Sequence, residues 1–311
     1  MLMGISILRV KASRTHGVRS GRKVTYDDIM TVGPASKIRG RLADFLAPPE
    51  PAFMPGLTRI GLACCLALLA VAPAARAQRK VPDGAKVLIL SGGQREHHGY
   101  REQALYLAGT LEDTRRFQVT IAEDAALVET PSLEKYDLVI LTADRRDPEF
   151  RFTPGQQQAI LAYVRAGHGF VSLHAADNAP ADWLPDWKQM LGGVYSHVGL
   201  PDGKAIKGHY TVHIADPSSP ITTGMADFEL NDELYSNMQM LPGVRPLATI
   251  DHLGTTWPVA WTWTYGTGRV FHLSLGHRDF GPAKPDPLAD PNLMKLLVRG
   301  VAFAAGHAPT P

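Results

Sequence analysis

Apolar residues recur from residue 86 onward in two alternating patterns. Continuous apolar runs are typical of strands buried on both faces of a parallel sheet. Between them, apolar residues three or four positions apart are typical of amphipathic helices. The runs predict strands at 86–91, 118–122, 136–142 and 169–174, and the helical spacing predicts helices at 100–115 and 153–166. This alternation predicts a doubly wound α/β fold with a mostly parallel sheet.

The second half of the chain is richer in β-structure. Further strands are expected at 209–215, 245–250, 258–264 and 269–275. Residues 265–268 have the composition of a hairpin turn between the last two strands, and 292–305 has the apolar spacing of a closing helix. No stretch is long enough to be a linker between domains. We therefore expect a single α/β domain over residues 78–311, with extra β-strands in its C-terminal half.

A different pattern occupies the N-terminus. Residues 54–77 start with a methionine and one positive charge, continue with an apolar run over 60–71 and end in Ala75-Arg76-Ala77. This is the layout of a secretory signal peptide that is cleaved after the tripeptide, and the run is short for a membrane span. Residues 1–53 show no sustained apolar period, so we expect a disordered leader or a start site assigned too early. The protein is then periplasmic or secreted, without stable membrane insertion after cleavage; an uncleaved anchor is the alternative.

Setting these segments aside changes the charge of the protein. The whole chain has a formal net charge of +2, but residues 1–77 hold 11 of its 32 basic residues and 4 of its 30 acidic residues. Residues 78–311 are therefore net acidic and show no basic stripe, which argues against nucleic acid as a partner. Both cysteines, Cys64 and Cys65, leave with the signal peptide. Thiol nucleophiles, disulfides and cysteine-ligated metals are then excluded.

Histidines follow the carboxyl ends of three expected strands. One strand ends in His174, the first strand leads through a glycine pair to His98, and the last strand leads to His277. In open α/β sheets, ligands bind just beyond the carboxyl ends of the strands. We therefore expect these three imidazoles to meet in one catalytic or metal-binding site; the alternative is three separate structural histidines. His272 lies within a strand and is expected to be packed in the interior.

Five further residues are candidates for the same site. Glu233 belongs to the only acidic pair in a motif context and is a candidate catalytic carboxylate. The alternative is a helix N-terminus, where acidic residues interact favourably with the helix dipole. The candidate substrate-binding residues are His197, Tyr235, Trp261 and Arg269. Trp261 offers an aromatic face to a sugar and Arg269 a clamp for a carboxylate or hydroxyl, with core packing and a structural ion pair as the respective alternatives.

Several short motifs follow one another along the chain. They are Ser91-Gly92-Gly93, His98-Gly99-Tyr100-Arg101, Ser172-Leu173-His174-Ala175-Ala176, Leu191-Gly192-Gly193, Asp232-Glu233-Leu234-Tyr235, Pro258-Val259-Ala260-Trp261 and Leu275-Gly276-His277. Their order and spacing, over residues 85–306, resemble the ThuA-like (trehalose-utilisation) family, which has a class I glutamine amidotransferase-like, flavodoxin-like fold. Ser219 stands where the family usually has His, a position that we interpret as loop-ordering. Amidotransferases of this fold carry a Cys where a strand here ends in His174, so thiol-based glutaminase chemistry is not expected.

The resemblance implies a function in carbohydrate metabolism. It indicates an oxidised sugar, such as a 3-keto-glycoside, as the small-molecule substrate. A ketone acidifies the neighbouring C–H, so a histidine base could remove that proton while a second histidine or a metal stabilises the enediolate, and elimination, isomerisation or hydrolysis could follow. His98, His174 and His277 could hold a divalent Zn, Mn, Fe or Ni ion; no nucleotide cofactor is expected. Two alternatives stay open: a non-catalytic carbohydrate-binding module and a generic metallohydrolase acting on esters or amides.

Overall fold

A computed structural model describes residues 84–93, 98–145, 150–195, 204–279 and 286–309. The chain divides into two units, Leu8–Arg79 and the combination of Met1–Ile7 with Lys80–Pro311, and every described residue belongs to the second unit. The expected leader and signal peptide at 1–77 lie outside the described residues, as does His197. No described helix has both the length and the apolarity needed to cross a bilayer.

In the described part of the chain, nine strands form one mixed sheet in the order β2-β1-β3-β4-β11-β10-β9-β6-β7. The first five strands of this order pair in parallel. They are β1 (Ala85–Gly92), β2 (Phe117–Ala122), β3 (Leu138–Ala143), β4 (Gly169–Leu173) and β11 (Gly268–Leu273). The order 2-1-3-4 followed by a fifth parallel strand is that of flavodoxin-like sheets. The expected doubly wound fold is therefore confirmed.

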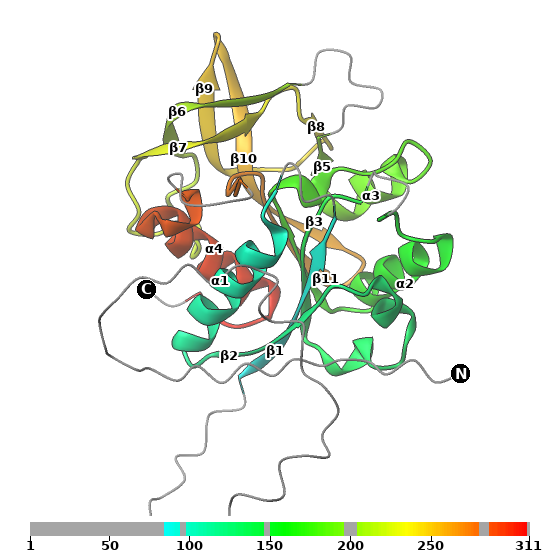
Figure 1. Ribbon diagram of the computed structural model, residues 1–311. Coiled ribbons are helices and arrows are strands. Elements are labelled where there is room, and N and C mark those ends of the chain that lie inside the picture. Colours follow the sequence, from blue (N-terminus) through cyan, green and yellow to red (C-terminus); the bar gives the residue numbers. More distant parts are fainter. Residues whose placement is uncertain (1–83, 94–97, 146–149, 196–203, 280–285, 310–311) are drawn as a thin grey trace, which may run out of the picture. The chain divides into compact units, whose positions relative to one another are not determined.

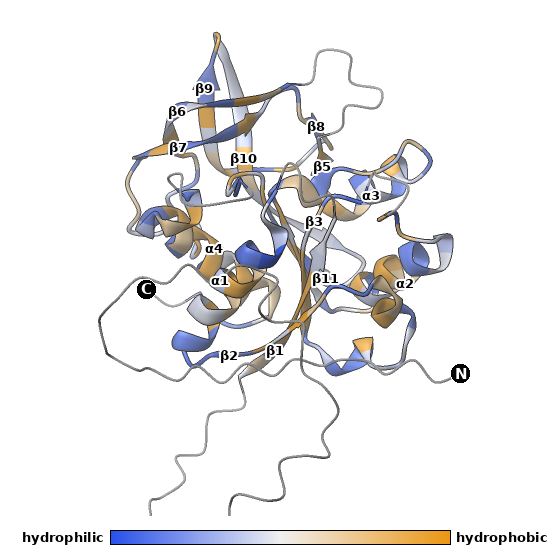
Figure 2. Ribbon diagram, in the orientation of Figure 1, coloured by the Kyte–Doolittle hydropathy of each residue, from blue (hydrophilic) through white to orange (hydrophobic). Residues whose placement is uncertain are grey.

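Helices cover both faces of this parallel half (Figure 1). They are α1 (Tyr100–Asp113), α2 (Pro154–Arg165), α3 (Leu184–Leu191) and α4 (Pro291–Ala304). One apolar layer joins α1 and α4 to one face of the sheet, and a second layer joins α2 and α3 to the other. Figure 2 shows apolar residues on the sheet-facing parts of these helices. Because both faces are covered, β3 has no exposed position, which explains its continuous apolar run.

The C-terminal half extends the sheet with antiparallel strands, which confirms the extra β-strands expected there. β10 (Thr255–Tyr265) pairs with β11, and β9 (Pro246–His252), β6 (Ala205–Ile214) and β7 (Phe228–Tyr235) follow in that order. β5 (Gly193–Val194) and β8 (Gln239–Met240) form a separate pair. Short 3-10 turns complete the described elements: η3 (Ala125–Glu129), η4 (Leu133–Lys135), η5 (His174–Asp177) and η6 (Pro287–Ala289).

Two of the elements with eight or more residues, β7 and α3, are not predicted by the sequence pattern. Alternate residues of β7 are buried, but one of the buried positions is Asp232, and a carboxylate there hides the period of two. Glu233 therefore lies in a strand, and the alternative interpretation as a helix N-terminus is wrong. α3 is only eight residues long and ends at Gly192, whose φ of 81° suits a helix C-cap.

Candidate functional site

Three imidazoles and one carboxylate meet at the carboxyl edge of the parallel sheet. His98, His174, Glu233 and His277 each offer one ligand atom, and these four atoms all lie within 4.8 Å of one another. His98 precedes α1, His174 follows β4, and His277 follows β11, so the convergence expected from the three strand ends is present. β7 adds Glu233 from the antiparallel extension. We refer to these four residues as the cluster.

His174 begins η5 directly after β4, with a backbone φ of 50°. A non-glycine residue in this left-handed region is uncommon, and such strained positions occur most often at functional sites. Its Nδ1 lies 2.7 Å from the carbonyl oxygen of Ser274, which can only accept a hydrogen bond, so Nδ1 carries the proton. The Nε2 atom therefore faces the centre of the cluster.

His277 is oriented in the same way by a carboxylate. Its Nε2 lies 2.9 Å from Oδ1 of Asp279, which also accepts from the Lys207 ammonium at 2.6 Å. Nε2 thus carries a proton that points outward, and Nδ1 faces the cluster. That inner atom lies 3.1 Å from Nε2 of His174 and 3.2 Å from Oε2 of Glu233.

The main chain before His277 is fixed by two buried side chains. The Asp232 carboxylate accepts from the backbone N–H groups of Gly276, at 2.6 Å, and of His277, at 2.9 Å. The Gln103 side-chain amide donates to the Gly276 carbonyl at 2.8 Å. Burial raises the pKa of Asp232, and these hydrogen bonds oppose the shift. Adjacent residues of β7 therefore have different roles. Asp232 binds the loop before His277 from one face of the strand, and Glu233 joins the cluster from the other face.

His98 and Tyr100 close the remaining side of the cluster. The Tyr100 hydroxyl lies 3.1 Å from Nδ1 of His98, and the two rings stack with centroids 5.0 Å apart. The His98 ring is 5.1 Å from the His174 ring and 4.7 Å from the His277 ring, centroid to centroid. His98 and Glu233 are partly buried, whereas His174 and His277 are buried.

Glu233 provides the negative charge of the cluster. Its Oε2 lies 3.4 Å from Nε2 of His174 and 3.2 Å from Nδ1 of His277. Burial alone would raise the pKa of Glu233, but the hydrogen bonds and charges of the two histidines outweigh it and hold this pKa well below its ordinary value. Burial would likewise lower the pKa of His277, but Glu233 and Asp279 together raise it. Glu233 and His277 thus each favour the charged form of the other.

The donor set fits a divalent metal. Ligand atoms about 2.0–2.1 Å from a tetrahedral centre lie about 3.3 Å from one another, and the three contacts among His174, His277 and Glu233 measure 3.1, 3.2 and 3.4 Å. Outward N–H groups bonded to a carbonyl and a carboxylate are typical of metal-binding histidines. If both rings are neutral, the inward lone pairs of His174 and His277 and the Glu233 carboxylate point into the same space. A cation or shared protons must then lie between them, because these groups otherwise repel one another.

Residues 86–304 match the ThuA family, described as trehalose utilisation. The chain belongs to the ThuA family. Among solved structures, a ThuA-like protein from Parabacteroides merdae shares 23% identity and a TM-score of 0.63, over 73% of this chain and 92% of that chain. A ThuA-like protein from Bacteroides uniformis shares 20% identity and a TM-score of 0.53, over 76% and 98%. These two likenesses show the shared fold; no curated protein matches.

Tyr235 of this ThuA protein contacts the cluster directly. Its hydroxyl lies 3.1 Å from Nε2 of His174, and its ring stacks on His174 with centroids 4.7 Å apart. On its other side it stacks on Tyr195 at 4.3 Å. Burial raises the pKa of Tyr235 well above its ordinary value, so the phenol keeps its proton. The structure therefore places an O–H donor at the cluster, and the substrate-binding role of Tyr235 stays a prediction.

The other predicted substrate contacts lie elsewhere. Trp261 is fully buried, stacks on His272 at 4.0 Å and donates from Nε1 to the Leu191 carbonyl at 2.8 Å. A side chain without exposed surface offers no face to a sugar, so this expectation is corrected in favour of core packing. Arg269 reaches the end of α4, where Nε bonds the Phe303 and Ala304 carbonyls at 3.2 and 3.3 Å. Neither residue belongs to the cluster, and His197 lies outside the described residues.

Sequence reasoning missed three residues that support the ThuA cluster. Asp232 and Asp279 each lie within two positions of a predicted site residue, and this proximity in the sequence could have identified them as supporting residues. Lys207 carries no such signal, because its contact with Asp279 depends on the position of β6 in the sheet. His272, expected to be packed, is fully buried, and burial lowers its pKa to about 3.

Proposed function

We propose that this ThuA-family protein is an enzyme that acts on oxidised sugars, with 3-keto-glycosides as the substrate class. The reaction would start with removal of the proton beside the ketone and continue by elimination, isomerisation or hydrolysis. The observation that carries the proposal is the meeting of three imidazoles and a carboxylate within 4.8 Å. The family description, trehalose utilisation, supports a sugar as substrate.

His174, His277 and Glu233 would hold a Zn, Mn, Fe or Ni ion, because contacts of 3.1, 3.2 and 3.4 Å join their ligand atoms. Two histidines and a glutamate form a known ligand set of catalytic zinc sites, which keep a further position open. When bound, the metal would supply Lewis acidity to the ketone oxygen. The three residues would bind and orient it, with Asp279 and the Ser274 carbonyl fixing the two rings.

His98 would then be the base. Its ring lies 5.1 Å from the His174 ring and 4.7 Å from the His277 ring, centroid to centroid, and imidazole is basic near neutral pH. It would take the proton from carbon 2 while the electron pair moves toward the ketone oxygen, where the Tyr235 O–H can donate a hydrogen bond. In elimination, the glycosidic oxygen leaves carbon 1 and receives the proton from His98.

The test combines metal content with turnover. Untagged protein is analysed for metals and assayed with 3-keto-trehalose, and trehalose serves as the control substrate. We expect about one metal ion per chain, loss of that metal in His174→Ala and His277→Ala, and turnover of the keto-sugar alone. His98→Ala should keep the metal and lose turnover. Absence of keto-sugar turnover with Zn, Mn, Fe and Ni would contradict the proposal, and metal-dependent turnover of simple esters would indicate a generic metallohydrolase instead.

We also propose that the protein is exported to the periplasm or secreted. The support is the sequence of residues 54–77, with one positive charge before its apolar run and a small-x-small end. Expression of the full chain with a fractionation assay tests this. Recovery of a shortened protein that starts at Gln78 in the exported fraction is expected, and an uncleaved cytoplasmic product would contradict the proposal.

A further inference from the structure

A row of polar side chains leads away from the cluster along the exposed face of β6 and β7. The cross-strand pairs of this row are Lys207 with Glu233, His209 with Asn231, and Thr211 with Glu229. Alternate residues of a strand point to the same face, so the row begins at the cluster residue Glu233 and advances about 7 Å with each pair. The row is therefore continuous with the candidate site.

The side chains of the row are ordered by contacts with one another. Nδ1 of His209 lies 3.1 Å from the Asn231 side-chain oxygen, and its Nε2 lies 3.0 Å from a Glu229 carboxylate oxygen. The Thr211 hydroxyl donates to the other Glu229 oxygen at 2.6 Å. Donors and acceptors thus alternate along the row and are held in place before any ligand arrives.

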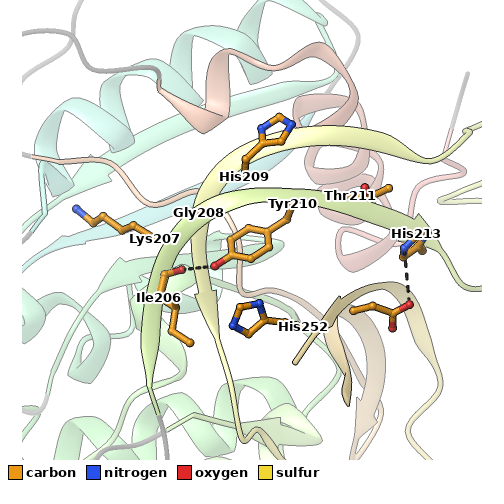
Figure 3. A pocket seen from close by; sticks show the side chains of 9 residues that line it. Ile206, Lys207, Gly208, His209, Tyr210, Thr211, His213 and His252 are labelled. Atoms are coloured by element: carbon orange, nitrogen blue, oxygen red, sulfur yellow. Dashed lines mark hydrogen bonds and ion pairs between the residues drawn. The ribbon is translucent and has the colours of Figure 1, made fainter. Parts of the chain in front are cut away.

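A hollow of about 510 Å³ lies beside this row, between β6 and the β9–β10 hairpin. In the described residues, β6 pairs with β9 only over Val212–Ile214, and the strands separate toward Lys207. Figure 3 shows the rings of Tyr210 and His252 between the separated strands, with Lys207 and His209 at the margins. The Tyr210 and His252 rings meet edge to face at 5.7 Å.

The floor of the hollow is specified by the sequence. The Tyr210 side chain folds back along β6, and its hydroxyl donates to the Ile206 carbonyl at 2.8 Å (Figure 3). Position 208, midway between Ile206 and Tyr210, requires a glycine, since a Cβ on Gly208 would lie 2.7 Å from the Tyr210 hydroxyl. An aromatic floor with a polar margin is the composition of many small-molecule sites.

The charge around the hollow limits its occupant. Asp251 lies 3.9 Å from His213, Glu229 lies 3.0 Å from His209, and Lys207 lies 2.6 Å from Asp279, so these charged groups of the hollow and the row are paired. A neutral occupant therefore fits better than a phosphate or carboxylate polymer, whose charges would compete with these pairs. Sugar hydroxyls both donate and accept, so they match the alternating groups of the row.

We propose that the hollow and the β6–β7 row bind additional sugar units of a neutral saccharide whose oxidised ring lies at the cluster. This inference rests on the proposed function and extends it, because it makes a glycoside of two or more units the preferred substrate. Binding energy from these remote units would position the reacting ring.

The test measures binding without turnover. Metal-free protein is titrated calorimetrically with glucose, trehalose, maltotriose, cellotriose and a galacturonic acid trimer. We expect at least one neutral trisaccharide to bind more tightly than glucose. His209→Ala and Asn231→Ala should each weaken that binding about three- to tenfold, the effect of losing a hydrogen bond or two. His307→Ala, which removes an imidazole beside Phe117 at the opposite end of the sheet, is the matched control and should bind as the unaltered protein does.

The outcomes separate the two proposals. If no neutral trisaccharide binds more tightly than glucose, or if the galacturonic acid trimer binds best, the saccharide site is rejected even where 3-keto-trehalose is turned over. Equal affinities in His209→Ala, Asn231→Ala and His307→Ala would reject it as well. Saccharide binding with the expected losses, but without turnover of keto-sugars, would keep the binding site and reject the proposed reaction.

Discussion

At the scale of single residues, two outward N–H groups decide what the cluster can bind. The Ser274 carbonyl and the Asp279 carboxylate fix the tautomers of His174 and His277, so both rings, when neutral, turn an acceptor toward Glu233. Three converging acceptors repel one another when no cation lies between them, so together they favour the binding of a cation. The proposed affinity of the site for a metal would therefore depend on residues outside the ligand set.

Asp279→Asn tests this arrangement. The substitution removes the charge that accepts from Nε2 of His277, and zinc affinity should fall about 10- to 100-fold. Competition with a chromophoric chelator measures the change. Asp182→Asn is the control, because Asp182 is exposed and its ion pair with Arg151 is long, at 3.8 Å. Equal zinc affinities in both variants and the unaltered protein would show that Asp279 does not support a metal ligand.

His213 and Asp227 predict a pH dependence of stability. Their hydrogen bond, at 2.8 Å, raises the pKa of His213 above 6.5 and lowers the pKa of Asp227 below 3.8. The His213 contribution is full below pH 6.5 and is lost as pH rises through its raised pKa; the Asp227 contribution is full above pH 3.8 and is lost as pH falls through its lowered pKa.

The Tm of Asp227→Asn should therefore fall short of the unaltered protein by more at about pH 5 than at about pH 9. The difference should be small, since the pair is exposed and screened by solvent. Thermal melts at both pH values measure it, with Asp182→Asn as the control. A larger difference at the higher pH would contradict the assignment.

At the scale of elements, the packing of α4 on β11 supports the loop that carries His277. Gly300 lies where α4 crosses the sheet, and a Cβ there would overlap the ring of Phe271 in β11. Phe271 is fully buried and belongs to the apolar layer under α1 and α4, so its ring has no open space to enter.

Gly300→Ala should lower stability by about 1–3 kcal/mol through overpacking. The matched control is Gly109→Ala in α1, where a Cβ meets nothing within 4 Å. There the same substitution should raise stability by about 0.5–1 kcal/mol, because alanine favours the helix. Urea denaturation of both variants measures the two effects. Changes of the same sign would show that packing at Gly300 is looser than described.

At the scale of the whole described domain, the cluster joins distant segments. Its ligands come from the loop before α1, the end of β4, β7 and the loop after β11, so a bound ion would connect the parallel half to the antiparallel extension. A ligand that binds the folded state alone stabilises that state by mass action.

Removal of the metal should therefore lower the Tm. At a zinc concentration 100 times the dissociation constant, the stabilisation is about 2.7 kcal/mol, which corresponds to about 5–10 °C for a domain of this size. Melts with and without EDTA measure the shift. His174→Ala should melt at the same temperature under both conditions. The metal site is contradicted if the Tm of the unaltered protein stays the same with EDTA and with added zinc, manganese, iron or nickel.

The sequence alone determined the alternation of strands and helices and the placement of His98, His174 and His277 after strand ends. These are local properties, since the period of burial and the end of a strand are visible in neighbouring residues. In a parallel sheet, strand ends share one edge, so the meeting of the imidazoles followed from the fold class.

Only the tertiary structure decided which other groups join them. The entry of Glu233 into the cluster, the support from Lys207 and the burial of Trp261 all depend on how β6, β7 and β10 continue the sheet beyond β11. The physical reason is that contacts between strands far apart in sequence are set by register and curvature, and a shift of one residue would exchange the two faces of β7. Asp232 would then face the cluster, and Glu233 would face the interior.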